Sequence, residues 1–339
     1  MAKMRMNQAI SAALADEMRA DPDVVMFGED VAVAGGPFKT SDGLLAEFGP
    51  SRVRDTPISE MGFLGAAVGA ASTGLRPVVE IMFIEFLGVA LDQLATEAAK
   101  FHYLSGGKLT VPLTVRASTG AGLGFGTQHS QTLEGWLIGT PGLKVAVASG
   151  PQTGYGLLRA AIQDDNPVVV LEPRVRYSTR AEVNVGDDAV IPLGVAARVA
   201  DGNDVTIVGL GGTVLTALDA AGRAQGWSAD VIDLQTVYPW DRATVLESVQ
   251  RTGRVVTVEE NPFGGGWGTD ITSVVGAELF GRLAAPPLRI TAPDVPVPYG
   301  KHLEARYVPD AEYVTAQIDH LVSHGELPPH WWDDGEVGQ

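Results

Sequence analysis

The chain has 339 residues, of which 45% are hydrophobic, so it is long enough to form two domains with cores of ordinary size. Its formal net charge of -17 disfavours nucleic acids and anionic membranes as partners, because both carry negative charge. The sequence contains no cysteine, which excludes disulfides, thiolate nucleophiles and cysteine-bound zinc. No run approaches the roughly 20 apolar residues that cross a bilayer, and Met1 to Arg19 lacks a signal-peptide core. We therefore expect a soluble, cytoplasmic protein.

The first half of the chain alternates between helical and strand-like patterns. Apolar residues recur at helical spacing from Met6 to Met18 and stop at Asp21-Pro22, which predicts an amphipathic opening helix. Further helices are expected at 88–104 and 154–163. Apolar runs suited to buried parallel strands lie at Val24–Phe27, Pro77–Phe83, Val111–Val115, Leu143–Ala148 and Pro167–Leu171. The alternation predicts an α/β domain with a mostly parallel sheet.

A second α/β domain is expected after a weakly patterned stretch between Tyr177 and Asp204. The strand pattern restarts at Val205–Leu210, Val231–Leu234 and Val255–Glu259. A proline-rich connection is expected at 285–299, and a last helix at 311–323. We therefore divide the chain into domains 1–190 and 191–339, both with mostly parallel sheets.

A glycine-rich turn at Val208–Val214 follows an expected strand and opens a helix. Asp230 and Asp233 lie at about the distance downstream where dinucleotide-binding folds place a ribose-binding acid. However, Val214 stands where that fingerprint has glycine or alanine. The segment is either a nicotinamide site or a tight strand-to-helix turn, so an NAD-dependent dehydrogenase is kept as an alternative.

Glu60 is the leading candidate for chemistry. It stands at the start of an expected helix. One face of that helix carries only small residues, which lets another backbone approach closely: Gly62, Gly65, Ala66, Gly69 and Ala70. The flanking residues Ile58, Met61 and Phe63 are expected to bury the carboxyl group and raise its pKa. The alternative is a carboxylate that only stabilises a helix start.

Several short strings occur in the order typical of one family. They are Gly28–Val31, Asp55–Gly62, Gly74–Pro77, Asp92-Gln93, Ala98–Lys100, Gln128–Gln131, Pro141–Val145, Asp164, Asn166–Val168 and Tyr238–Asp241. Their order, over almost the whole chain, resembles the beta subunits of pyruvate, branched-chain 2-oxo acid and acetoin dehydrogenase complexes, which depend on thiamine diphosphate. The resemblance implies a transketolase-like pyrimidine-binding domain, followed by a transketolase C-terminal-like domain for subunit assembly and acyltransferase docking.

The resemblance also implies roles for individual residues. Glu60 matches the glutamate that hydrogen-bonds a ring nitrogen of the cofactor's aminopyrimidine, and His129 matches a histidine near the reacting carbon, so both are implied to be catalytic. Phe86 matches the aromatic residue that packs on the pyrimidine, and Glu29 matches a carboxylate in an acidic passage between paired active sites. Ile58 is a further implied cofactor contact. On periodicity alone, Phe86 and His129 are typical of structural residues.

Two metal ions are implied in the same way. Residues matching those that hold a structural potassium ion in several relatives are Leu113, Ala161, Ile162, Asp164 and Asn166, although a plain loop is the alternative. Thiamine diphosphate also needs magnesium, which the family holds with a Gly-Asp-Gly motif and a downstream Asn. Here the nearest string is Gly186–Asp188, without such an Asn. The chain therefore carries the pyrimidine half of the site and not the diphosphate half.

The missing half implies an alpha subunit that holds the diphosphate and most of the magnesium, in an alpha2beta2 heterotetramer. The acidic second domain resembles the part that docks a small basic domain of the lipoyl-bearing acyltransferase core. The expected reaction is oxidative decarboxylation of a 2-oxo acid of the pyruvate type, with acyl transfer to lipoyl groups.

The string from Ile81 to Val89 looks closest to acetoin dehydrogenase beta subunits, because pyruvate enzymes often have Gln where Val89 stands. Pyruvate, branched-chain 2-oxo acids and acetoin are therefore all candidate substrates. A non-catalytic assembly subunit is a further alternative.

Overall fold

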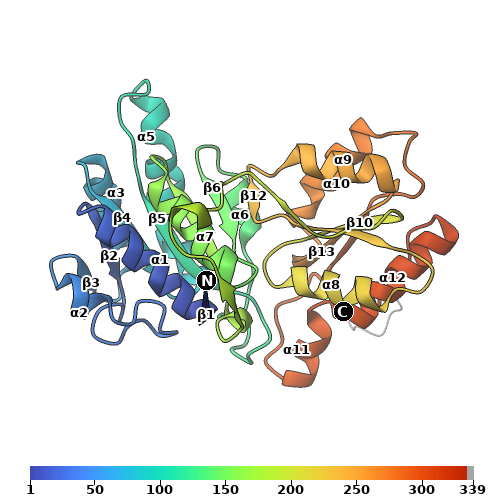
Figure 1. Ribbon diagram of the computed structural model, residues 1–339, viewed down its shortest axis with the longest axis horizontal. Coiled ribbons are helices and arrows are strands. Elements are labelled where there is room, and N and C mark those ends of the chain that lie inside the picture. The colour runs from blue at the N-terminus through green and yellow to red at the C-terminus, as the bar shows by residue number, and fades with distance from the viewer. Residues whose placement is uncertain (334–339) are drawn as a thin grey trace. The chain divides into compact units, whose positions relative to one another are not determined.

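The computed structural model describes residues 1–333, which divide into two compact units (Figure 1). The N-terminal unit comprises Met1–Val195 and a return segment, Gln235–Pro239. The C-terminal unit comprises Ala196–Leu234 and the described chain from Trp240 onward. Each unit has its own mostly parallel sheet with helices around it, which confirms the expected α/β class.

The sheet of the N-terminal unit contains β2 (Val24–Gly28), β3 (Val53–Asp55), β4 (Arg76–Ile81), β5 (Thr114–Thr119), β6 (Lys144–Val147), β7 (Val168–Pro173) and β12 (Thr236–Tyr238). The strand order is β12-β6-β7-β5-β4-β2-β3. Strands β2 to β7 pair in parallel, and β12 pairs antiparallel with β6. Two further strands, β1 (Ala2–Arg5) and β8 (Arg180–Val183), form a separate antiparallel pair.

Helices cover both faces of this sheet. They are α1 (Met6–Ala20), α2 (Leu44–Phe48), α3 (Glu60–Ser72), α4 (Leu87–Asp92), α5 (Ala99–Leu104), α6 (Glu134–Ile138) and α7 (Pro151–Gln163), with short turns η1 (Ile84–Phe86), η2 (Gln93–Ala98), η3 (Arg174–Arg176) and η4 (Asp187–Ala189). Ile10 of α1 and Leu158 of α7 are fully buried in one cluster with Met26 and Val168. Alternate strand residues point to the opposite face, and α3 packs on β2 and β4 outside that cluster.

The C-terminal unit contains a five-stranded sheet. Its strands are β9 (Ala197–Ala200), β10 (Val205–Gly209), β11 (Ala229–Asp233), β13 (Val255–Pro262) and β14 (Leu288–Ala292), in the order β14-β13-β10-β11-β9. Only β9 pairs antiparallel among these described strands. The helices are α8 (Thr213–Arg223), α9 (Arg242–Thr252), α10 (Gly268–Glu278), α11 (Lys301–Tyr307) and α12 (Ala311–His324).

Capping residues explain where several helices begin and end. The Asp241 side chain accepts a hydrogen bond from the Thr244 N–H at 3.0 Å and starts α9, whose first turn otherwise has unpaired donors. Gly253 ends that helix with a φ of 72°, a left-handed conformation that glycine adopts without strain. Asp310 and Gly325 repeat this arrangement at the two ends of α12.

Most predicted elements are confirmed within a few residues, including the strand at 205–210 as β10 and the helix at 154–163 as α7. The prediction for 285–299 was wrong, because β14 lies inside it and pairs in parallel with β13. Strand β12 was not predicted, since three residues are too short to show a period. Within residues 1–333, no helix is long and apolar enough to cross a membrane.

A buried group of charges lies inside the N-terminal unit. The Arg116 guanidinium on β5 contacts Glu172 of β7 at 2.8 and 2.9 Å and Glu80 of β4 at 2.8 Å. The Tyr177 hydroxyl donates to Glu172 at 2.8 Å. The side chains of Arg116 and Glu172 are 1% exposed and that of Glu80 is 7% exposed. The cluster links three neighbouring strands beneath the carboxyl edge of the sheet.

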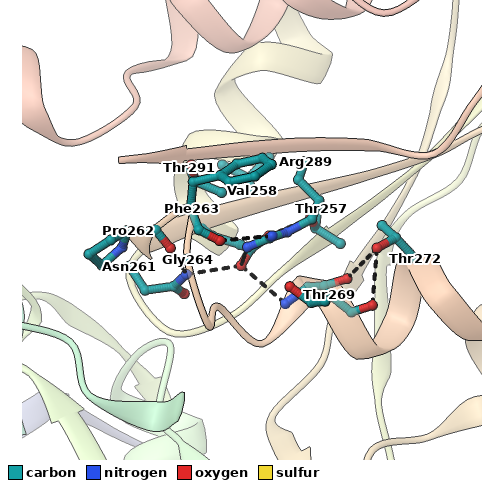
Figure 2. A network of polar contacts seen from close by, with 12 residues as sticks. Thr257, Val258, Asn261, Pro262, Phe263, Gly264, Thr269, Thr272, Arg289 and Thr291 are labelled. Atoms are coloured by element: carbon teal, nitrogen blue, oxygen red, sulfur yellow. Dashed lines mark hydrogen bonds and ion pairs between the residues drawn. The ribbon is translucent and has the colours of Figure 1, made fainter. Parts of the chain in front are cut away.

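A second ion pair shapes a loop of the C-terminal unit. Glu259 on β13 is fully buried and accepts hydrogen bonds from Arg289 at 2.9 Å, from the Asn261 side chain at 3.0 Å and from the Gly268 N–H at 3.0 Å. Arg289 also donates to the Phe263 carbonyl at 2.9 Å, as Figure 2 shows. A Cβ at Gly268 would lie 2.1 Å from a Glu259 oxygen, so the close approach requires glycine.

Candidate active site

The residues expected to be catalytic or to bind cofactor all follow carboxyl ends of parallel strands in the N-terminal unit. Glu29 follows β2, Ile58 and Glu60 follow β3, Phe86 follows β4 and His129 follows β5. Strands β3, β2, β4 and β5 are neighbours in that order, so their loops share one edge of the sheet. Ligands of open parallel sheets bind at this edge.

Two carboxyl groups, those of Glu29 and Glu60, lie within electrostatic reach of each other at this edge. Burial raises the pKa of Glu29, and the negative charges of Glu60 and Asp30 raise it further. Among the described residues, neither Glu29 Oε1 nor Thr56 Oγ1 has a hydrogen-bond partner, although both atoms are buried. Buried polar atoms in native proteins normally have partners, so these two atoms are expected to bind ordered water or a polar ligand.

The loops that carry these acids are tied together by backbone contacts. Asp55 ends β3, and its Oδ1 accepts a hydrogen bond from the Ala32 N–H at 2.7 Å. The Thr56 N–H donates to the Gly28 carbonyl at 3.0 Å. These bonds connect the segment leading into Glu60 with the turn after β2, which places both acidic residues at adjacent strand ends.

The surroundings of Glu60 differ from the prediction. Its carboxyl group stands in the first turn of α3, but Ile58 is 85% exposed and Met61 is 58% exposed, so neither covers it. Phe63 is buried and packs into the core. The small residues Gly62, Ala66 and Gly69 form part of the exposed face of α3. The chain by itself therefore does not enclose Glu60.

An aromatic group occupies the same edge beside β4 and β5. Phe86 contacts the His129 ring edge-to-face, with centroids 5.5 Å apart and an interplanar angle of 88°. Phe83 contacts the same imidazole at 4.9 Å. Phe86 and His129 are both half-buried, so each keeps part of its ring accessible. This arrangement combines a flat apolar surface with a group able to transfer a proton.

The residues expected to hold potassium lie at the other end of the sheet. Leu113 precedes β5, Asp164 and Asn166 precede β7, and Ala161 and Ile162 end α7. A strand of this length separates the two edges by roughly 20 Å at about 3.3 Å per residue.

At that opposite edge, an arginine already supplies positive charge. The Arg76 guanidinium donates to the Ile162 carbonyl at 3.0 Å and to the Asp164 carbonyl at 2.9 Å. The carbonyls of Leu113 and Ala161 accept from backbone N–H groups within the chain. A potassium ion at these residues would therefore compete with Arg76 for the Ile162 and Asp164 carbonyls.

Comparison with known proteins places most of the chain in one family. The family description "Transketolase, pyrimidine binding domain" matches residues 2–179, and "Transketolase, C-terminal domain" matches residues 194–314. The pyruvate dehydrogenase E1 component subunit beta of Rhizobium meliloti (strain 1021) is 45% identical over 93% of this chain and 69% of the relative. The acetoin:2,6-dichlorophenolindophenol oxidoreductase subunit beta of Bacillus subtilis (strain 168) is 42% identical over 95% of this chain and 98% of the relative. The chain belongs to this family of beta subunits.

A solved structure agrees with the family assignment. The protein titled "Split gene transketolase, inactive beta4 tetramer" has 26% sequence identity and a TM-score of 0.76, covering 94% of this chain and 98% of its own. The transketolase-like fold that the sequence predicted is therefore confirmed in both units.

The diphosphate half of a cofactor site does not fit the described residues of this beta subunit. Asp187, in the nearest match to the family's metal motif, pairs with Arg159 at 2.9 Å. Among residues 1–333, no group of three or more histidine or acidic side chains could hold a metal ion. The pyrimidine half does fit, since Glu29, Glu60 and Phe86 offer carboxyl groups and an accessible ring.

The dinucleotide alternative is not supported by the geometry of the glycine turn. Asp230 is fully buried and pairs with Arg251 and, at 3.2 Å, with Arg198, so it is not available for a ribose. A Cβ at Gly209 would lie 2.9 Å from the Val214 backbone, which is the packing of a tight strand-to-helix turn.

Sequence reasoning missed two charged residues beside the aromatic group. Glu85 Oε1 accepts a hydrogen bond from the Gln131 N–H at 2.6 Å, and Arg174 donates to the His129 carbonyl. These partners are 46 and 45 residues apart in sequence, so no spacing pattern reveals them. Only the strand order β4-β5-β7 brings them together.

Proposed function

We propose that this chain is the beta subunit of a thiamine-diphosphate-dependent 2-oxo acid dehydrogenase that is active only with an alpha subunit. It would decarboxylate a 2-oxo acid oxidatively and transfer the acyl group to lipoyl groups of an acyltransferase core. The observation that carries the proposal is Glu60, a carboxyl group at the strand edge, beside Glu29 and open on the side of Ile58 and Met61.

Each residue at the edge has a distinct task in this proposal. Bound thiamine diphosphate supplies the carbon nucleophile and the electron sink for decarboxylation. Glu60 would share a proton with a ring nitrogen of the cofactor. Glu29, whose pKa is raised by burial and by the negative charge of Glu60, lies beside it. Phe86 would pack on the organic ring, and Ile58 would be a further contact of the cofactor. His129 would donate a proton to the substrate or stabilise developing charge.

The alpha subunit would provide what the described residues lack. Ile58, Met61 and Val89 are exposed apolar side chains in the segments that follow β3 and β4. Their cover by a partner would exclude water from Glu60. The same partner would hold the diphosphate with magnesium. An alpha2beta2 heterotetramer is the proposed assembly. The cytoplasmic location expected from the sequence stays a prediction.

The C-terminal unit offers a surface for a basic domain of the lipoyl-bearing core. A cavity of about 440 Å³ is lined by Phe263, His330 and Trp332 together with Asp294 and Asp333. The rings stack, with His330 and Trp332 centroids 4.4 Å apart. Aromatic faces and carboxylates together favour lysine or arginine side chains. Asp294→Asn is expected to weaken binding of that domain, while Asp270→Asn, on the exposed start of α10, leaves it unchanged.

The substrate is proposed to be a 2-oxo acid of the pyruvate type, with acetoin as the rival. The test is to co-express the chain with an alpha subunit from the same source and to assay pyruvate, branched-chain 2-oxo acids and acetoin with added thiamine diphosphate and magnesium. Turnover of one substrate by the pair, and none by the beta chain alone, is expected. Cofactor-dependent turnover by the beta chain alone, or none by the pair with any of these substrates, would contradict the proposal.

A further inference from the structure

The loop that carries His129 depends on glycine for its shape. Gly120, Gly122, Gly124 and Gly126 all have positive φ angles, between 74° and 98°. A chain of alternating left-handed glycines has many accessible conformations when unfolded, so its own backbone does little to select one of them. Contacts that reach this loop from other elements therefore contribute to holding the His129 ring against Phe86.

Arg174 contacts the loop at both of its ends. It lies in η3, directly after β7, and is 3% exposed. Its guanidinium donates to the Gly120 carbonyl, where the loop leaves β5, and to the His129 carbonyl near the loop's end. It donates as well to Ser118 Oγ at 3.0 Å. One rigid, planar cation thus joins two points of the loop that are nine residues apart in sequence.

Glu85 holds the next residues from the opposite side. Its Oε1 accepts the Gln131 N–H at 2.6 Å, two residues after His129. Burial raises the pKa of Glu85, while the Gln131 N–H and the positive charge of Arg174 lower it. Its Oε2 is buried with no hydrogen-bond partner among the described residues. The two charged side chains therefore interact with the same loop and with each other.

Aromatic packing connects this pair to the ring of His129. The Arg174 guanidinium lies over Phe83, 4.9 Å from the ring centroid, and over Phe125 at 5.6 Å. Phe83 in turn contacts both His129 and Phe86. A shift of the Arg174 guanidinium would therefore move both the His129 backbone and the Phe83 ring, which contacts the His129 imidazole.

We infer that Arg174 and Glu85 are positioning residues that clamp the 120–131 loop and thereby fix the His129 imidazole beside Phe86. The inference rests on the proposed function, because it takes His129 to act on the substrate. Neither residue needs to touch the substrate for this role. Removing the clamp leaves the cofactor edge at Glu60 intact but lets the imidazole move away from the reacting atoms, so turnover falls more than substrate binding does.

The activity test uses the alpha–beta complex with Arg174→Met, which removes the donors and keeps the length of the side chain. We expect kcat to fall by about tenfold or more with KM changed less than about twofold, since a 1 Å misplacement of a reacting group has effects of this order. Arg174→Lys, which keeps the charge and one or more donors, is expected to recover part of the loss.

Arg176→Met is the matched control. Arg176 lies in the same short helix and donates to the Ser149 carbonyl at 3.2 Å, away from the loop. It should keep kcat within about twofold of the parent complex. Because the control removes the same charge, a common loss of activity in both variants would indicate an electrostatic or folding effect and would overturn the clamp.

Hydrogen exchange tests the clamp without any assay of activity. In Arg174→Met, peptides covering 120–131 should exchange about tenfold faster than in the parent, while peptides from β13 remain unchanged. Combining Glu85→Leu with Arg174→Met should add little to either single effect, because both act on one loop. Unchanged exchange and unchanged kcat in a folded Arg174→Met complex would refute the clamp while leaving the proposed function standing. If the parent complex is inactive but the loop exchanges faster in the variant, the proposed function is refuted and the clamp is supported.

Discussion

Replacing Arg116 with methionine removes the guanidinium that pairs with two buried carboxylates in the N-terminal unit. The side chains of Arg116 and Glu172 are 1% exposed, and that of Glu80 is 7% exposed. Breaking a buried pair leaves an unpaired charge in the core and destabilises a protein by about 3–5 kcal/mol. In a unit of this size each kcal/mol lowers the melting temperature by about 2–4 °C, so a fall of roughly 6–20 °C is expected.

The same variant should respond to pH in a defined direction. Burial raises the pKa of Glu80, and the charge of Arg116 opposes that rise. In Arg116→Met the opposing charge is absent, so the folded state favours a protonated carboxyl group more strongly. A carboxyl whose pKa is raised in the folded state contributes stability at low pH that is lost as the pH rises. The deficit should therefore be larger at about pH 8 than at about pH 5.

Differential scanning calorimetry measures both effects, with Arg19→Met as the control. Arg19 pairs with Asp16 at 2.8 Å and with Glu47 at 2.6 Å, but its side chain is 53% exposed. An exposed pair contributes at most about 1 kcal/mol, so the control should melt close to the parent. The reasoning is refuted if the melting temperature of Arg116→Met is as close to that of the parent as the melting temperature of Arg19→Met is, at both pH values.

Three further predictions concern the described chain. The Gly142→Ala variant should melt several degrees below the Gly74→Ala variant, although both positions have φ above 100°. A Cβ at Gly142 would lie 2.0 Å from the Ala99 carbonyl oxygen, whereas a Cβ at Gly74 would have none of the described atoms within 4 Å. Equal melting would contradict this packing. Glu29→Gln should raise the melting temperature at about pH 8 and not at about pH 4, because the raised pKa of Glu29 makes its ionisation destabilising; a lower melting temperature at high pH would be the opposite result. Melting in KCl and in NaCl at equal ionic strength should agree, because Arg76 occupies the Ile162 and Asp164 carbonyls; stabilisation by potassium alone would show that the ion binds despite Arg76.

The sequence predicted the fold because its signals were local. Buried parallel strands are short apolar runs, and the runs at 205–210 and 143–148 reappear as β10 and β6. The exception at 285–299 arose because prolines surround a strand of only five residues, β14, which the parallel partner β13 stabilises. Pairing with a neighbour outweighed the local composition there.

The site was predictable only in part. Glu60, Phe86 and His129 came from strings that resemble a family, and the strand order puts their loops on one edge. The burial of Glu60 was inferred from apolar neighbours in sequence, but Ile58 and Met61 point away from the chain's own core. Apolar neighbours show that a surface avoids water, not which molecule covers it.

The charged residues that pair over long distances in sequence left no signal in it. Arg116 stands inside the fully buried strand β5, and Arg174 and Glu85 contact a loop that belongs to a different part of the chain. Long-range pairs of this kind depend on the order of strands in the sheet, which spacing along the chain does not encode.

The central claim is that the Glu60 carboxyl group activates a cofactor held jointly with an alpha subunit. The most direct measurement is kcat for the preferred substrate in the purified alpha–beta complex carrying Glu60→Gln, at saturating thiamine diphosphate, with Glu47→Gln on the exposed helix α2 as the control. Loss of a proton-sharing group predicts a fall of roughly 100-fold or more in the Glu60 variant, with the complex assembled and the control unchanged. A Glu60→Gln complex that turns over within about twofold of the parent would contradict the account.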